Sequence, residues 1–217
     1  MPKVLIPTTN PDIIVGRNPD DPVPTAAVAL EVDLLFDAAA KRFSLEIVKI
    51  GKSTGNFKNH KDFLDWAKGQ IASPKWVQSK GFDSTAGKRK PTKMSLKYKD
   101  PFYLLVKLSD NWNWRFSADG APLSMDSYWT GKRVFLDAFS FDSAGAVVTS
   151  PSPEVTCKNA YTIVNCDKAK ETSGSHNFEA RYNLHVDLVE DPTDMANSSY
   201  IPLILDPDVR WPGGDGP

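Results

Sequence analysis

The chain is poor in the residues that most often hold metals or redox centres, with 3 His and 2 Cys among 217 residues. The cysteines, Cys157 and Cys166, are nine positions apart, and no further ligands stand near them at the spacing of a zinc site. We expect two reduced, buried thiols. A disulfide across a hairpin is the alternative, and it would need an oxidising compartment. The sequence predicts no metal and no cofactor.

Long apolar runs are also absent. No stretch reaches the roughly 18–20 apolar residues of a membrane span. The apolar run Val4-Leu5-Ile6 is closed by Pro7, far short of the about 7–15 apolar residues of a secretory signal. We therefore expect a cytoplasmic protein that makes no membrane contact.

No complete catalytic motif is present. Residues 51–54 (GKST) resemble the end of a phosphate-binding loop, but Glu46 stands where that loop requires glycine. His185 and Asp187 are two apart on the expected outward face of a strand, and no serine or cysteine at a recognisable nucleophile turn accompanies them. We interpret them as solvated polar residues. No catalytic residue is predicted, and a non-enzymatic protein is the preferred interpretation.

Acidic loops near the C-terminus could in principle bind calcium. Glu190, Asp191 and Asp194 cluster before the last expected strand, but the twelve-residue loop with alternating ligands is missing. Calcium is therefore not predicted.

What the chain does have is a strongly uneven distribution of charge. Its net charge is -1, yet residues 49–99 carry 13 Lys and Arg against 3 Asp and Glu, a balance of +10. Residues 1–48 balance at -3 and residues 100–217 at -8. A basic middle between acidic ends indicates either an anion-binding patch or complementary faces that pair between copies.

Alternation of apolar and polar residues predicts strands along most of the chain. Val28, Leu30, Val32, Leu34 and Phe36 share one face, and Phe43, Leu45 and Ile47 follow, which predicts an antiparallel hairpin. Further strands are expected near 102–108, 112–116, 134–139, 147–148, 161–164, 178–188 and 200–205. With 17 Pro and 13 Gly and no βαβ alternation, the sequence predicts a mainly β fold. We expect an antiparallel β-sandwich of about eight to nine strands, with a closed barrel as the alternative.

One short helix is expected inside a basic excursion over residues 51–95. Asn59 can cap it, Asp62 follows three residues later, and Pro74 ends it. Phe63, Trp66, Ala67 and Ile71 would share its buried face, and His60 would be exposed. We expect a single domain over 1–217, with a Pro-rich arm at 8–25 and an irregular tail at 210–217.

The most distinctive aromatic cluster is at 112–116. Trp112, Trp114 and Phe116 share one face, and Arg115 lies on the other. Facing inward they are core residues, whereas facing outward they would form a stacking platform for sugar rings or bases. A surface for a carbohydrate or anionic ligand would then combine Trp112, Trp114 and Arg115 with Lys88, Arg89 and Lys90. Nucleic acid is not favoured as a partner because the whole chain is not basic.

The outline resembles the small bacterial inclusion-body protein family (PixA/AidA type). The similarity rests on the apolar start Val4-Leu5-Ile6 and the Pro-rich arm with Asn10-Pro11, Asn18-Pro19 and Asp21-Pro22. It also rests on the run of strands and on the ending Leu205-Asp206-Pro207-Asp208-Val209. The basic excursion departs from that pattern. The resemblance implies a β-sandwich that accumulates or self-assembles in the cytoplasm, and it carries no catalytic residues over.

The sequence therefore predicts a protein that works by association, in the first place with itself as a homo-oligomer. Opposite charges on separate segments can pair head-to-tail between copies, and exposed sheet edges offer a second mode. Assembly driven by charge should weaken as salt rises. A module that binds a carbohydrate or anionic ligand is the alternative.

Overall fold

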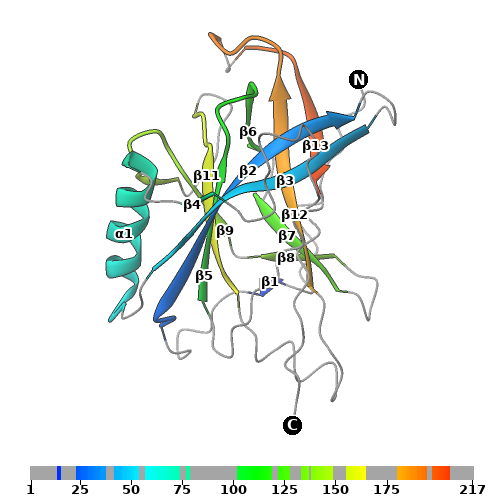
Figure 1. Ribbon diagram of the computed structural model, residues 1–217. Helices are drawn as coiled ribbons and strands as arrows, with labels where there is room; N and C mark the ends of the chain where they lie inside the picture. Colours follow the sequence, from blue (N-terminus) through cyan, green and yellow to red (C-terminus); the bar gives the residue numbers. More distant parts are fainter. Residues whose placement is uncertain are drawn as a thin grey trace.

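The computed structural model describes residues 14–15, 23–37, 42–53, 57–73, 77–78, 102–118, 122–127, 133–136, 138–148, 155–164, 180–194 and 197–205. These residues form two β-sheets and one helix (Figure 1). The fold is therefore mostly β, as the alternation pattern predicts.

The first sheet has five strands in a row, with a sixth beside them. In order they are β1 (Ile14–Val15), β8 (Arg133–Leu136), β7 (Leu123–Ser127), β12 (Ala180–Val189) and β13 (Tyr200–Leu205), and β6 (Trp114–Phe116) also pairs with β12. The second sheet has the order β10 (Val147–Val148), β9 (Ala138–Phe141), β11 (Asn159–Val164), β5 (Phe102–Leu108), β2 (Ala26–Asp37), β3 (Arg42–Lys52) and β4 (Val77–Gln78).

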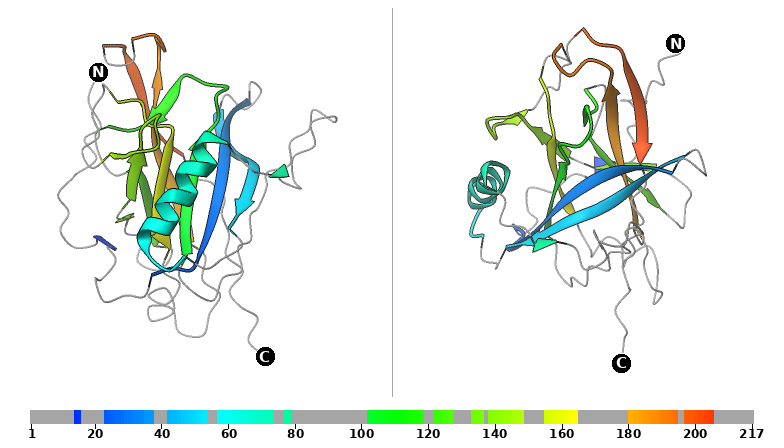
Figure 2. Two further views of the ribbon diagram at one scale, coloured as in Figure 1. Left: turned by 90° about the vertical axis from the view of Figure 1, so that its left-hand side faces the viewer. Right: turned by 45° about the horizontal axis from the view of Figure 1, so that its top comes forward.

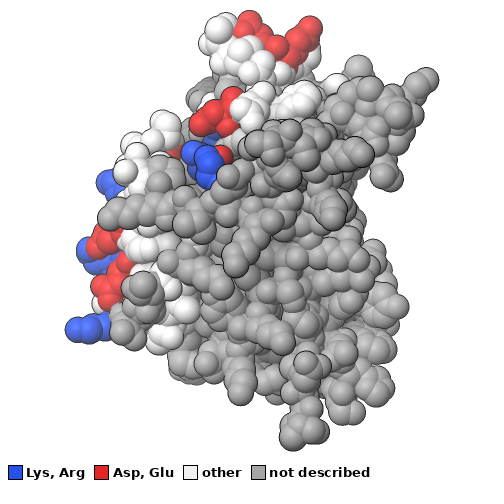
Figure 3. Space-filling view, in the orientation of Figure 1, with Lys and Arg blue, Asp and Glu red and all other residues white. Residues whose placement is uncertain are grey.

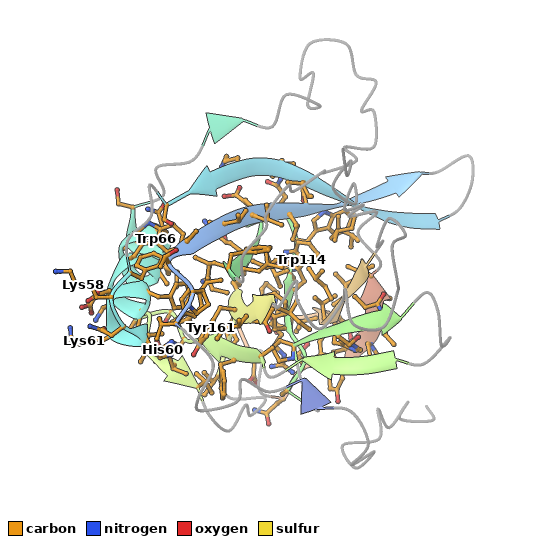
Figure 4. The ribbon with its side chains drawn as sticks, turned by 90° about the horizontal axis from the view of Figure 1, so that it is seen from below. Lys58, His60, Lys61, Trp66, Trp114 and Tyr161 are labelled. Atoms are coloured by element: carbon orange, nitrogen blue, oxygen red, sulfur yellow. The ribbon has the colours of Figure 1, made fainter. Side chains whose placement is uncertain are left out.

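The two sheets share one apolar core. Alternate residues of β2 and β5, such as Val32 and Val106, pack with Phe116 and Val186 of the first sheet. Figure 4 looks along this layer from below and shows Trp114 within it. The period-2 pattern from Val28 to Leu34 is thus confirmed as a buried strand face.

The predicted hairpin is confirmed. β2 and β3 pair antiparallel from Val28 opposite Lys52 to Asp37 opposite Arg42, with a shift of register between Glu31 and Val32. Such a shift is typical of a β-bulge, in which one strand carries an extra residue and bends.

The expectation of purely antiparallel sheets is wrong at two pairs. β2 and β5 run parallel, from Ala26 opposite Phe102 to Val32 opposite Leu108, and β1 and β8 are also parallel. A parallel pair needs a long crossover. The chain between β2 and β5 supplies one, because it contains β3, the helix and β4.

Helix α1 (His60–Ala72) covers the face of the second sheet that is turned away from the first (Figure 2). Asn59 caps it, and its side chain accepts a hydrogen bond from the amide of Asp62. Phe63 and Ala67 are buried, and the ring of Phe63 stacks on Tyr103 of β5 with centroids 3.8 Å apart. The predicted cap, extent and apolar face of this helix are therefore confirmed.

The described residues contain thirteen strands, more than the eight or nine expected. Part of the excess is in two-residue strands, whose length is too short to give a periodic signal: β1 and β4. β1 also lies inside the stretch predicted as a Pro-rich arm. Residues 79–95 of the basic excursion and the 210–217 tail lie outside the described residues.

Candidate interaction site at the sheet edges

Of the residues predicted to form an aromatic and basic surface, the structure describes Trp112, Trp114 and Arg115. Trp114 is 0% exposed and belongs to the core between the sheets, and Trp112 is half-buried against the same core. Arg115 points to the other face of the first sheet, as alternation predicts, but it is buried there. Lys88, Arg89 and Lys90 lie outside the described residues. Trp114 therefore does not contribute to an exposed stacking platform.

Arg115 forms an ion pair with Asp187 on the outer face of the first sheet. The two residues are in register on β6 and β12, with 3.4 Å between Arg115 Nε and Asp187 Oδ2, and each is 1% exposed. The Arg115 guanidinium also lies over the ring of Tyr200, 5.6 Å from its centroid. Burial raises the pKa of Asp187, whereas the charge of Arg115 acts to lower that pKa.

His185 and Asp187 are not the solvated residues that the sequence predicts, because both are buried. His185 Nε2 lies 2.7 Å from the hydroxyl oxygen of Ser124 on β7, so a serine does accompany this histidine. The partner was not recognisable from sequence, since only strand pairing brings β7 beside β12. With Ser124 and His185 both shut off from solvent, the pair is a structural hydrogen bond in this conformation.

His60 likewise departs from its predicted exposure. It is half-buried at the start of α1, with Nδ1 3.1 Å from the Tyr103 hydroxyl and Nε2 3.2 Å from the Tyr161 hydroxyl. Figure 4 shows His60 and Tyr161 between the helix and the sheet, whereas Lys58 and Lys61 point away from the molecule. The imidazole of His60 therefore links α1 to β5 and β11 through hydrogen bonds.

An acidic cluster lies on the described part of the surface. Figure 3 shows acidic side chains at the tip of the β12–β13 loop, where Glu190, Asp191 and Asp194 are exposed. The hydroxyl and amide of Thr193 bond to Asp191 and lower its pKa. Among the described residues, no group of three His, Cys, Asp or Glu could hold a metal ion.

β13 ends the first sheet and carries two exposed isoleucines. Ile201 is 55% exposed and Ile204 is 42% exposed, and in the described part of the chain they are the only large apolar side chains so exposed. The amide of Glu190 donates to the carbonyl of Ser199. This bond shows which residues of β13 direct their backbone groups toward β12, because such residues alternate along an antiparallel strand. Tyr200, Pro202 and Ile204 therefore point their backbone groups away from β12, toward the open side.

Pro202 blocks that open side. A proline has no amide hydrogen, and its ring occupies the position through which the next strand would bond. Proline at the open side of an edge strand is one of the devices by which proteins prevent unwanted strand pairing. The β13 edge is therefore closed to a regular additional strand.

β3 lies near the other extreme of the second sheet. Among the described strands only β4 follows it, and β4 pairs with just Lys49 and Ile50 (Figure 2). The Val32 carbonyl accepts from Ser109 on the β5 side, so its neighbour Asp33 points its backbone groups toward β3. Glu46, in register with Asp33, therefore bonds to β2, and the backbone groups of Leu45 and Ile47 point to the open side.

Asp33 of β2, the strand beside β3, is a buried acidic residue. Its carboxylate is buried and accepts hydrogen bonds from the Ser109 hydroxyl at 2.7 Å and the Asn111 amide at 2.8 Å. Glu46 is its register partner on β3. Ser109 and Asn111, which follow β5, therefore hold the carboxylate of Asp33 in place.

These features define a mostly β protein of two sheets and one helix, in which Pro202 interrupts one edge strand and, among the described strands, only β4 lies on the outer side of β3. Comparison with protein-family models, curated proteins and solved structures found no match. Within the described residues, no helix combines the length and apolar character needed to cross a membrane.

Proposed function

We propose that this protein is a non-enzymatic β-sandwich that acts by associating with itself through the open edge of β3. The observation that carries the proposal is the contrast between the two edges. The β13 edge is closed by Pro202, whereas β3 presents residues 43–47 without a proline and, among the described strands, without a neighbour on that side. An open edge is a template for a strand of another chain.

The sandwich is supported by the core that the two sheets share. Packing of two sheets face to face leaves their edge strands at the sides, where a second copy has access to them. An assembly or inclusion-forming role, which the family resemblance implies, fits such a protein.

The test is the mass of the purified protein in solution, measured by light scattering over a range of concentrations. We expect wild-type mass to rise with concentration. Phe43→Pro places on β3 the block that Pro202 places on β13, and it should shift the protein to monomer while circular dichroism stays native. Lys61→Ala, a change at an exposed helix position, is the matched control and should associate like wild type. A wild-type protein that stays monomeric at every concentration would overturn the proposal.

A further inference from the structure

A row of polar residues crosses the outer face of the second sheet, the face on which α1 packs (Figure 2). Asn159 of β11 is in register with Lys107 of β5, and Lys107 is in register with Glu31 of β2. Glu31 is in turn in register with Lys49 of β3. Because residues in register on neighbouring strands share a face, these residues form one continuous row. The next row along the strands, which includes Leu105, is apolar and packs against α1.

The charged groups of this row are only partly paired. Lys49 Nζ donates to Glu31 Oε1 at 2.8 Å. Lys107 Nζ is 3.7 Å from Glu31 Oε2 and 3.9 Å from Asp110 Oδ2, and both distances are too long for a hydrogen bond. Within the described residues Lys107 therefore donates no side-chain hydrogen bond. Its side chain is 17% exposed, so part of it meets solvent.

The residues on either side of Lys107 each carry a buried oxygen atom that lacks a donor. Among the described residues, neither Glu31 Oε2 nor Asn159 Oδ1 has a hydrogen-bond partner. The side chain of Glu31 is only 9% exposed, and Asn159 is buried. Buried polar atoms are rarely left without a partner in folded proteins, so a molecule other than the chain is expected to supply the donors.

We infer that Glu31, Lys107 and Asn159 bind a vicinal diol, the pair of adjacent hydroxyl groups that sugars and polyols carry. One hydroxyl donates to Glu31 Oε2 and the other to Asn159 Oδ1, while the ammonium of Lys107 donates to both hydroxyl oxygens. A hydroxyl combines one donor with two acceptor lone pairs, which is what these three atoms require. An anion would face two oxygen acceptors and a cation would face the ammonium, so neither fits the row as well.

Isomeric probes test the ligand class. Propylene glycol has its two hydroxyls on adjacent carbons, and its isomer trimethylene glycol has them on the terminal carbons. In a titration followed by heteronuclear NMR, propylene glycol should shift the amide signals of Lys107 and Asn159 more than trimethylene glycol does at equal concentration. Equal shifts with both isomers would overturn the assignment to adjacent hydroxyls.

Two further probes distinguish the source of the diol. Methyl α-D-mannopyranoside presents the diol on a sugar ring, and glycerol presents it on an open chain. A mannoside that binds at least about tenfold more tightly than glycerol assigns the site to a sugar, whereas similar affinities assign it to the diol alone. A single ordered water is the other occupant that would satisfy these atoms. If no probe shifts the signals, the site holds water only and the inference is overturned.

Substitutions test the three residues. Lys107→Met removes the donor to both hydroxyls and should weaken mannoside binding by at least about tenfold. Lys158→Met makes the same change at a neighbouring lysine, which pairs with Asp110 outside the row, and it is the matched control that should bind like wild type. Circular dichroism establishes that both variants fold. Lys107→Met that is folded and binds the mannoside like wild type would overturn the inference.

Asn159→Leu is the second variant, which keeps the inference testable if Lys107→Met fails to fold. Within the described part of the chain the Asn159 side chain forms no hydrogen bond, so its replacement removes a predicted ligand contact and no contact of the fold. Affinity for the mannoside should fall by about three- to tenfold, the effect of one lost hydrogen bond. Unchanged affinity would remove Asn159 from the site and overturn the inference. None of these outcomes bears on self-association, which light scattering measures separately.

Discussion

At the scale of single residues, the outer face of the first sheet carries several buried polar side chains, and these affect the stability of the fold. Arg115, Ser124, Asn183, His185 and Asp187 are all buried there, on three neighbouring strands. Within the described part of the chain, Asn183 Nδ2 and Asp187 Oδ1 have no hydrogen-bond partner. A buried polar group without a partner costs about 1–3 kcal/mol, so this face is sensitive to any further loss of a partner.

Removing Arg115 should destabilise the fold strongly. In Arg115→Met, Asp187 stays buried without its counter-ion, and breaking a buried pair in this way costs about 3–5 kcal/mol. The double variant R115M/D187L removes both charges and should recover most of that loss. Urea unfolding of the four proteins of this cycle measures it. A double variant as unstable as R115M would show that the ion pair is not the source of the loss.

The protonation of Asp187 should leave a signature in the pH dependence of stability. Because burial raises its folded pKa, the folded state binds this proton more tightly than the unfolded state. The Asp187 contribution is therefore fully present below the ordinary aspartate pKa of about 3.9 and is lost as pH rises through the raised value. The difference in unfolding free energy between wild type and Asp187→Asn should accordingly become less favourable to wild type over that window. A difference independent of pH would contradict the raised pKa.

Sequence alone could not place these residues. The alternation along 178–188 correctly separates core positions such as Val186 from His185 and Asp187, and it fixes which face each residue occupies. It cannot tell whether the second face meets solvent, because that depends on residues distant in sequence. The same limit explains why the sequence predicts an exposed His60, because its partners, Tyr103 and Tyr161, come from strands far along the chain.

At the scale of elements, the features fixed by local contacts were predictable. The α1 cap depends on Asn59 and Asp62, three residues apart, and the β2–β3 hairpin joins neighbouring segments. The parallel pairing of β2 with β5 was not predictable, because nothing in either strand records which distant strand lies beside it. The position of β3 near the end of its sheet likewise follows from that topology and could not be recognised from the sequence of β3.

The N-cap of α1 offers a direct measure of how firmly the helix is held. Asn59→Ala removes the side chain that accepts from the Asp62 amide and should cost about 1 kcal/mol of stability. Asn59→Ser or Asn59→Asp should retain most of it, since both residues are good caps. Thermal unfolding of the three variants provides the measurement. Equal loss in all three would mean that Asn59 acts through something other than the cap.

At the scale of the whole molecule, two modes of self-association make different demands. Pairing of the basic segment 49–99 with the acidic segment 100–217 depends on many charges and should weaken steeply with salt. Pairing through the β3 edge would depend mainly on backbone hydrogen bonds. Segregated charge along the sequence therefore does not by itself decide how copies meet.

Salt dependence separates the two modes. Between about 0.01 M and about 1 M salt the Debye length falls from about 30 Å to about 3 Å, which screens exposed charges almost completely. For edge pairing we expect the dissociation constant to rise by no more than about tenfold, because backbone hydrogen bonds between strands do not depend on exposed charges. Sodium sulfate should offset even this loss, since it strengthens apolar burial. Light scattering of wild type and of Phe43→Pro across this range makes the comparison. Complete dissociation of wild type at high salt would assign the assembly to the segregated charges and exclude the β3 edge as its main contact.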